Sequence, residues 1–110
     1  KLEITVTDEI DGGDLPRTID FRLHSYAAGA IDKTGKLRLE RAPGAATIRV
    51  EASSPLVKAS STDRFRYPDD SGPEYPSDRE MPVQYHYNWH FAPAAKLRIV
   101  CRIQVEFICN

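Results

Sequence analysis

The chain has 110 residues, 41% hydrophobic and 28% charged, a size that suits one compact domain, residues 1–110, with a single core. It carries 15 Lys and Arg against 16 Asp and Glu, a formal net charge of −1, which excludes global attraction to nucleic acid or to an acidic membrane. No apolar run approaches the roughly 20 residues that span a bilayer, and the chain starts with a strand pattern rather than a signal peptide. We expect no membrane insertion, no nucleic-acid partner, and binding through local features.

Apolar and polar residues alternate through the first half, which is the period of β-strands with one buried face. "LEITVT" puts Leu2, Ile4 and Val6 on one face, and "DEIDGGDLP" then predicts a loop. "TIDFRLH" resumes the alternation, and "SYAAGA" after it is at best a single helical turn. "DKTGK" and the Pro-Gly of "RAPGAA" have turn chemistry and predict two tight connections between strands. No window holds helical periodicity.

Residues 53–82 differ in composition, since they hold five of the eight prolines. We expect a long exposed loop here, Pro-rich and acidic at about 68–82, with "LVKAS" and "RFRY" as short edge strands. The closing segment "KLRIVCRIQVEFIC" keeps its apolar residues on one parity. The polar residues in the middle of this segment predict that its two ends are more buried than its middle. About seven strands without helices predict an all-β fold, an antiparallel two-sheet β-sandwich of immunoglobulin-like type.

The stretch "VQYHYNWHF" separates two faces completely. Val83, Tyr85, Tyr87, Trp89 and Phe91 share one parity, which we expect to be core, because burying aromatic rings is strongly favourable. The other parity holds Gln84, His86, Asn88 and His90, which are the candidate binding residues. We expect this polar face to be open to solvent or covered by a neighbouring domain or a protein partner.

The same four-residue face does not predict a metal centre. On a strand, His86 and His90 lie about 13 Å apart, so one zinc ion cannot bind both. His24 looks similarly isolated, and only a ligand from another strand would change this. Asp8, Glu9, Asp11 and Asp14 fall in one predicted loop, but not in the order of a calcium-binding EF-hand, and we interpret them as solvated charge. We expect no metal and no cofactor.

Catalytic patterns are equally absent. No G-x-S-x-G elbow occurs, and the serines gather in the Pro-rich region. Cys101 and Cys109 share parity with core residues, whereas a reactive thiol is partly exposed. About 26 Å would separate them along one strand, too far for a disulfide. They are either buried free thiols or partners of cysteines outside this segment. We predict that the chain is not an enzyme and has no catalytic residue.

"DKTGKLRLERAPGAATIRVEASSP" resembles a stretch of bacterial and animal sandwich modules in which "T-D-x-x-G-x-h-x-h", with h apolar, precedes a turn and a strand "h-x-h-x-V-x-A". Transthyretin-like and carboxypeptidase-regulatory-like domains have it, as do macroglobulin domains of the alpha-2-macroglobulin and complement family. "QYHYNWHFAPAAKLRIV" favours the last, because Tyr87, Phe91 and Pro93 resemble its "Y-x-x-F-x-P" passage, with one more residue between the tyrosine and the phenylalanine. Two departures are "GGDLP" where that family has "G-x-P-x-P", and the absence of a linker before "CRIQVEFICN".

This resemblance implies a non-catalytic scaffold domain of a secreted protein; the family's "GCGEQ"-type thioester motif is not in this chain. We therefore predict a structural or protein-interaction module of a larger secreted or surface protein. The alternative is a carbohydrate- or ligand-binding module that uses exposed aromatic rings. The position of Trp89 discriminates between them: a buried Trp89 favours the first, and a solvent-facing cluster with Tyr85 and Tyr87 favours the second.

Overall fold

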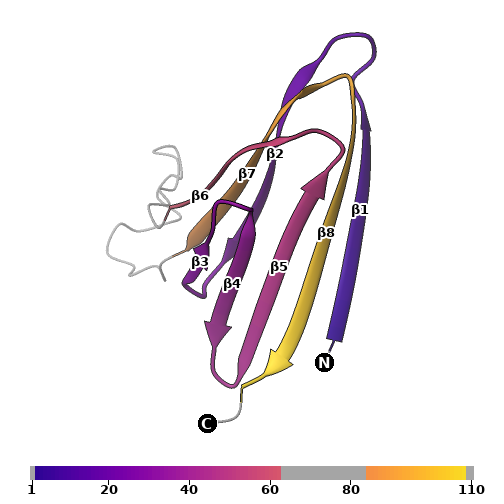
Figure 1. Cartoon of the computed structure of the whole chain (residues 1–110). Helices are drawn as coiled ribbons and strands as arrows, with labels where there is room; N and C mark the ends of the chain where they lie inside the picture. Colours follow the sequence, from indigo (N-terminus) through magenta and orange to yellow (C-terminus); the bar gives the residue numbers. More distant parts are fainter. Residues whose placement is uncertain (1, 63–83, 109–110) are drawn as a thin grey trace, which may run out of the picture.

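The computed structural model describes residues 2–62 and 84–108, which form strands without any helix. Figure 1 shows these strands in two layers. The strands are β1 (Leu2–Asp11), β2 (Arg17–Ser25), β3 (Gly29–Ile31), β4 (Lys36–Arg41), β5 (Gly44–Ala52), β6 (Leu56–Thr62), β7 (Tyr85–Ala94) and β8 (Lys96–Phe107). None of the described segments could cross a membrane as a helix.

All strand pairs are antiparallel, and they form two unequal sheets. The larger sheet has the order β1-β8-β5-β4-β3, and the smaller one has the order β2-β7-β6. The all-β class and the antiparallel two-sheet sandwich are therefore confirmed. The described residues hold eight strands where the sequence suggested about seven.

The core lies between β7 of the smaller sheet and the β8, β5 and β4 strands of the larger one. From β7 come Tyr87, Trp89 and Phe91, each at most 1% exposed. Leu37, Ile48, Val50, Leu97, Ile99 and Cys101 face them from the larger sheet. The prediction that the odd parity of β7 is core is thus confirmed for these three rings; Tyr85 is half-buried, and Val83 lies outside the described residues.

The described chain passes from one sheet to the other at four connections, and two of them, β5–β6 and β7–β8, are fixed by hydrogen bonds. Ala95 alone separates β7 from β8, and its carbonyl accepts a hydrogen bond from the Gly12 N–H at 2.7 Å. Between β5 and β6, Ser53 pairs with Arg98 of the larger sheet, while the buried Ser54 hydroxyl donates to the Ala92 carbonyl of β7 at 2.6 Å. Adjacent serines therefore join the two layers at this end of the sandwich.

A hydrogen bond from the Trp89 indole connects the turn between β3 and β4 to the core. Asp32 Oδ1 accepts from the Thr34 and Lys36 N–H groups, which closes the turn. Gly35 follows at φ +85°, a left-handed conformation that glycine adopts without penalty. Its carbonyl accepts the indole N–H of Trp89 at 2.7 Å. The "DKTGK" and "RAPGAA" turns, predicted from composition, are both confirmed.

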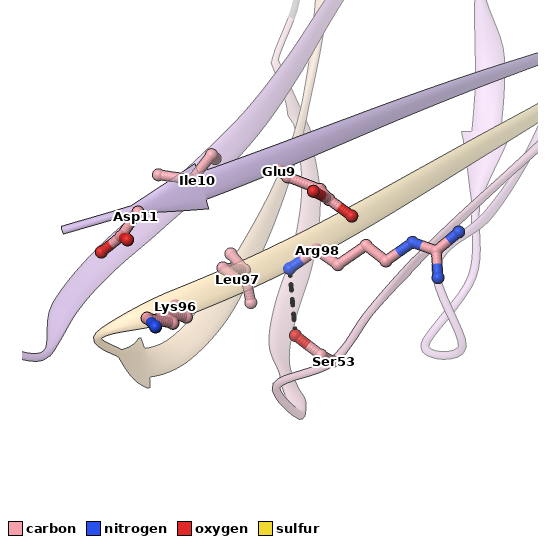
Figure 2. Close-up of a pocket in the computed structure, with 7 residues that line it drawn as sticks. All are labelled: Glu9, Ile10, Asp11, Ser53, Lys96, Leu97 and Arg98. Carbon is pink, nitrogen blue, oxygen red and sulfur yellow. Dashed lines mark hydrogen bonds between the residues drawn. The ribbon is translucent and has the colours of Figure 1, made fainter. Parts of the chain in front are cut away.

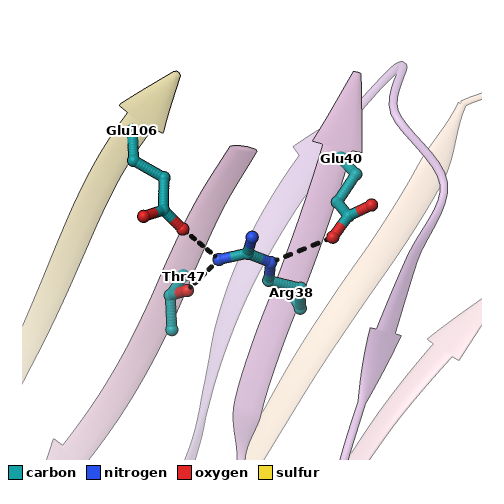
Figure 3. A network of polar contacts seen from close by, with 4 residues as sticks. All are labelled: Arg38, Glu40, Thr47 and Glu106. Atoms are coloured by element: carbon teal, nitrogen blue, oxygen red, sulfur yellow. Dashed lines mark hydrogen bonds and ion pairs between the residues drawn. The ribbon is translucent and has the colours of Figure 1, made fainter. Parts of the chain in front are cut away.

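A charged network crosses the outer face of the larger sheet (Figure 3). Arg38 of β4 donates to Glu106 of β8 at 2.7 Å, to Thr47 of β5 at 2.9 Å and to Glu40 of its own strand at 3.3 Å. These side chains are substantially exposed, so each ion pair contributes little, about 0–1 kcal/mol. The network ties three strands in one register and marks this face as solvent-facing.

Two local expectations were wrong, whereas "SYAAGA" forms no helical turn, which is within the limit of one turn expected for it. β1 continues through "DEID" to Asp11, so Asp8, Glu9 and Asp11 are strand residues rather than loop residues. β8 is buried at its start but not at its end, where Phe107 is 84% exposed, because the smaller sheet does not reach that far.

The region from residue 53 to 82 can be assessed only in part. "LVKAS" belongs to β6, a full strand at one edge of the smaller sheet. The loop at about 68–82 and "RFRY" lie outside the described residues. Cys101 is a buried free thiol, as expected for one of the two cysteines, and its burial raises the pKa of the thiol. Cys109 lies outside the described residues.

Trp89→Ala should lower the free energy of unfolding by about 3–5 kcal/mol, because it empties the centre of the core. His90→Ala, on the opposite face of the same strand, should cost no more than about 1 kcal/mol. Urea denaturation followed by circular dichroism measures both. Equal losses from the two substitutions would contradict the assignment of faces.

Gly35→Ala should destabilise the domain by about 1–3 kcal/mol, since a non-glycine residue is strained at this φ. The added Cβ would also lie 3.0 Å from atoms of Trp89 and Leu56. Gly13→Ala is the matched control for the strain alone, because Gly13 also has positive φ and its Cβ would meet nothing within 4 Å. A loss no larger at Gly35 than at Gly13 would show that contact with Trp89 contributes nothing.

Candidate functional site

The outer surface of the smaller sheet is polar, and we call it the histidine face. Cross-strand register places its residues in three rows: Asp20, His90 and Lys58; Arg22, Asn88 and Ser60; His24, His86 and Thr62. Alternation explains the set, because the intervening residues of β2 and β7 turn inward to the core. With Arg22 and Lys58 positive and Asp20 negative, this face has a net charge of +1 when its histidines are neutral.

Each of the four predicted binding residues contacts β2 or the bend that follows it. Gln84 Nε2 donates to the Tyr26 hydroxyl at 3.2 Å, and His86 stacks on His24. The other two meet at Asp20: the Asn88 amide donates at 3.4 Å, and His90 Nδ1 lies 2.6 Å from the carboxylate. The structure therefore brings all four onto one surface, and it joins them through β2 rather than to one another.

His24 is not isolated, contrary to the sequence-based expectation. It lies directly opposite His86, and the two rings stack with centroids 3.9 Å apart and planes 20° from parallel. Burial of the His86 ring, with repulsion from His24 and Arg22, lowers its pKa from the ordinary 6.5. Two cations this close would repel each other, so the stack favours at least one neutral ring near neutral pH.

Asp20 is the acidic centre of the same face. It accepts from His90 and Asn88, and Arg22 Nη2 lies 3.8 Å from its second oxygen. The hydrogen bond from His90 is the main cause of the lowered pKa of this carboxyl. Asp20 thus stays ionised and holds His90 in a fixed orientation across the strand pair.

The geometry of the histidine pair does not suit a metal ion. The lone pairs of imidazole nitrogens lie in the ring plane, so stacked rings direct them side by side rather than toward one point. Within residues 2–62 and 84–108, no group of three or more His, Cys, Asp or Glu side chains could hold a metal. The absence of a metal and of catalytic activity stay predictions.

A pocket of about 480 Å³ lies elsewhere, where the ends of β1 and β8 meet the Ser53 turn (Figure 2). In the pair register, Glu9 faces Arg98, and Asp11 faces Lys96. Ser53 contributes its hydroxyl, which accepts from the Arg98 N–H at 3.0 Å. The lining contains two carboxylates and two cations, so its charge favours neither an anion nor a cation. The pocket therefore does not indicate a class of ligand.

Comparison with known proteins finds no matching family model and no matching curated protein. The assignment of this site therefore depends on its geometry alone.

Sequence reasoning missed the β2 half of the histidine face. The signal was present, because "TIDFRLH" has Asp20, Arg22 and His24 on the parity opposite to its apolar residues. What alternation does not reveal is the pairing of β2 with β7, which are separated in the chain by four of the described strands. Only that register sets His24 against His86 and Asp20 against His90.

Stability should fall when the pH drops from about 7.5 to about 5.5. His86 in the unfolded chain takes up a proton near 6.5, whereas the folded chain resists protonation, so acid favours the unfolded state. Asp20 does not contribute in this window, because its stabilising effect is lost only as the pH falls below 3.8 toward its lowered folded pKa. Urea denaturation at both pH values should show a smaller decrease for His86→Gln. An unchanged decrease in that variant would refute the explanation.

Proposed function

We propose that this domain is a non-catalytic protein-interaction module and that the histidine face is its contact surface. The observation that carries the proposal is the ordering of this face: its side chains are already held by cross-strand contacts to Asp20, His24 and Tyr26. A surface whose rotamers are fixed before binding loses less conformational entropy on association. The histidine face then provides much of the contact with the partner, and the exposed loops and strand edges provide the rest.

Charge suggests the chemistry of the partner. Arg22 and Lys58 lie at opposite edges of the face, on β2 and on β6. Asp20 offsets one of these charges and is itself engaged by His90. A partner surface carrying carboxylates would complement this arrangement, and such contacts act mainly on specificity and on the rate of association.

The alternative function, sugar binding on exposed aromatic rings, is not favoured, because its candidate rings are buried or half-buried. Trp89 and Tyr87 are each at most 1% exposed, and Tyr85 is half-buried. Sugar-stacking sites need an exposed ring face. The burial of Trp89 is the outcome that favours a structural and interaction module over this alternative.

The wider setting is part of the same proposal. An immunoglobulin-like topology, kinship with macroglobulin domains, and placement in a larger secreted or surface protein are supported by the sandwich architecture together with the "DKTGK" and "YNWHFAP" passages. In that setting the domain provides a rigid frame, and its outer sheet faces provide contacts with neighbours. Sequencing of the regions that flank this segment tests the setting directly.

Affinity capture from the extracellular fluid of the source organism tests the contact surface. Wild-type domain, Arg22→Glu on the histidine face and Arg49→Glu on the outer face of the larger sheet form a matched set, because both arginines are exposed strand residues. We expect a protein that binds wild type and Arg49→Glu directly, after purification, and that binds Arg22→Glu at least tenfold more weakly.

The result that contradicts the proposal is equally defined. A partner that binds all three proteins equally, or that loses affinity only for Arg49→Glu, places the contact elsewhere. Binding of the domain to purified glycans, unaffected by Arg22→Glu, would favour the carbohydrate alternative instead.

A further inference from the structure

The four sheet edges in the described residues differ in how well they are protected against pairing. β3 is only three residues long. β2 and β6 each show a register shift against β7, and β6 carries Lys58 next to its shift. Short strands, bulges and lysines are the usual means by which natural proteins block pairing at an edge. Three of the four edges therefore have at least one such device.

The β1 edge, defined as the free side of Leu2–Asp11, has none of these three devices, and its charged residues lie mostly in its second half. It pairs with β8 in one unbroken register over ten residues, from Leu2 opposite Val105 to Asp11 opposite Lys96. It contains neither proline nor lysine. Within the part of the chain that the structure describes, no strand lies on its other side. Its alternate N–H and C=O groups thus point outward, in the arrangement that accepts a further strand.

The first half of this edge is also apolar and open. Leu2 is 59% exposed, and Ile4 and Val6 are each 43% exposed. The register puts all three on the same face as Ile103 and Cys101, the face that forms the core at the other end of the sheet. Figure 1 shows β1 and β8 running side by side toward the end of the sheet where β1 begins and β8 ends. There the apolar face continues past the cover of the smaller sheet.

We propose that two copies of this chain pair through the β1 edge, antiparallel, about a two-fold axis at Ile4. In this register Ile4 lies opposite Ile4 of the second copy, and Leu2 lies opposite Val6. On the other face Glu3 lies opposite Thr5, so no two carboxylates meet. Self-complementarity of this kind is what a two-fold interface requires, and it selects a second copy over an unrelated strand.

Neighbouring registers are worse. An axis at Thr5 sets Leu2 opposite Asp8, and an axis at Val6 sets Glu3 opposite Glu9. An axis between two residues joins the apolar face of one copy to the polar face of the other. With the axis at Ile4, Asp8, Glu9 and Asp11 remain outside the apolar pairs, and their charges oppose any longer overlap. The acidic half of the strand therefore restricts pairing to the apolar half.

The inference concerns a different surface from the histidine face and does not depend on the proposed function. Ile4 lies on the larger sheet, whereas the histidine face belongs to the smaller one. Edge-to-edge pairing buries less than the ~1,600 Å² of a standard interface. We expect a reversible dimer with a dissociation constant on the order of micromolar.

Sedimentation velocity over a concentration series tests the dimer. Ile4→Lys puts a lysine at the axis and should weaken association at least tenfold. Val57→Lys is the matched control, because Val57 is 62% exposed on another edge strand; it should associate as wild type does. Circular dichroism checks that each variant keeps its β structure. A monomeric wild type at concentrations on the order of 1 mM, or equal dimerisation of wild type and Ile4→Lys, overturns the proposal.

Disulfide trapping tests the register without relying on a destabilising charge. In a Cys109→Ser background, Ile4→Cys should give a covalent dimer under mild oxidation, because its Cα atoms meet across the axis within disulfide range. Thr5→Cys should not, since it faces Glu3. Cross-linking of Thr5→Cys in place of Ile4→Cys overturns the assigned register, and absence of cross-linking in both overturns the pairing.

Discussion

The hydrogen bond from the Trp89 indole to the Gly35 carbonyl is the contact on which the arrangement of the two sheets depends. Trp89 is fully buried at the centre of β7, and its N–H must find an acceptor there. The acceptor comes from the opposite sheet, at the one turn position whose φ of +85° brings backbone against the ring. Glycine at 35 and tryptophan at 89 therefore require each other, and together they set the position of the β3–β4 hairpin.

This contact also determines what the other side of β7 can do. Because side chains alternate, holding Trp89, Tyr87 and Phe91 in the core forces His86, Asn88 and His90 outward. The edge strand β2 extends the same alternation, with Phe21 packed edge-on against Trp89 at 5.8 Å. Asp20 and His24 are therefore placed by the packing of their inward neighbours. The rigidity of the histidine face follows from the core beneath it.

Alternation in the sequence predicted which face of a strand is apolar, but not what covers that face. The split of "VQYHYNWHF" was correct because its inward rings are at the middle of the sandwich. Phe107 and Leu2 follow the same alternation and are exposed, because the smaller sheet does not extend over them. Likewise the stack of His24 on His86 depends on a long-range register between β2 and β7, and no local pattern specifies such a register.

The unequal widths of the two sheets link stability to association. Among the described strands, the three-stranded layer does not cover all five strands of the larger sheet, and Leu2, Ile4 and Val6 of β1 are exposed. β3 is only three residues long, so little surface is left open at that edge. β1 has ten paired residues, with an apolar half and an acidic half. The apolar half gains from a second strand, and the acidic half is repelled by its own copy. Such a division favours a closed pair over an open-ended array, because a two-fold pairing uses both exposed edges at once and leaves no third copy an equivalent place to bind.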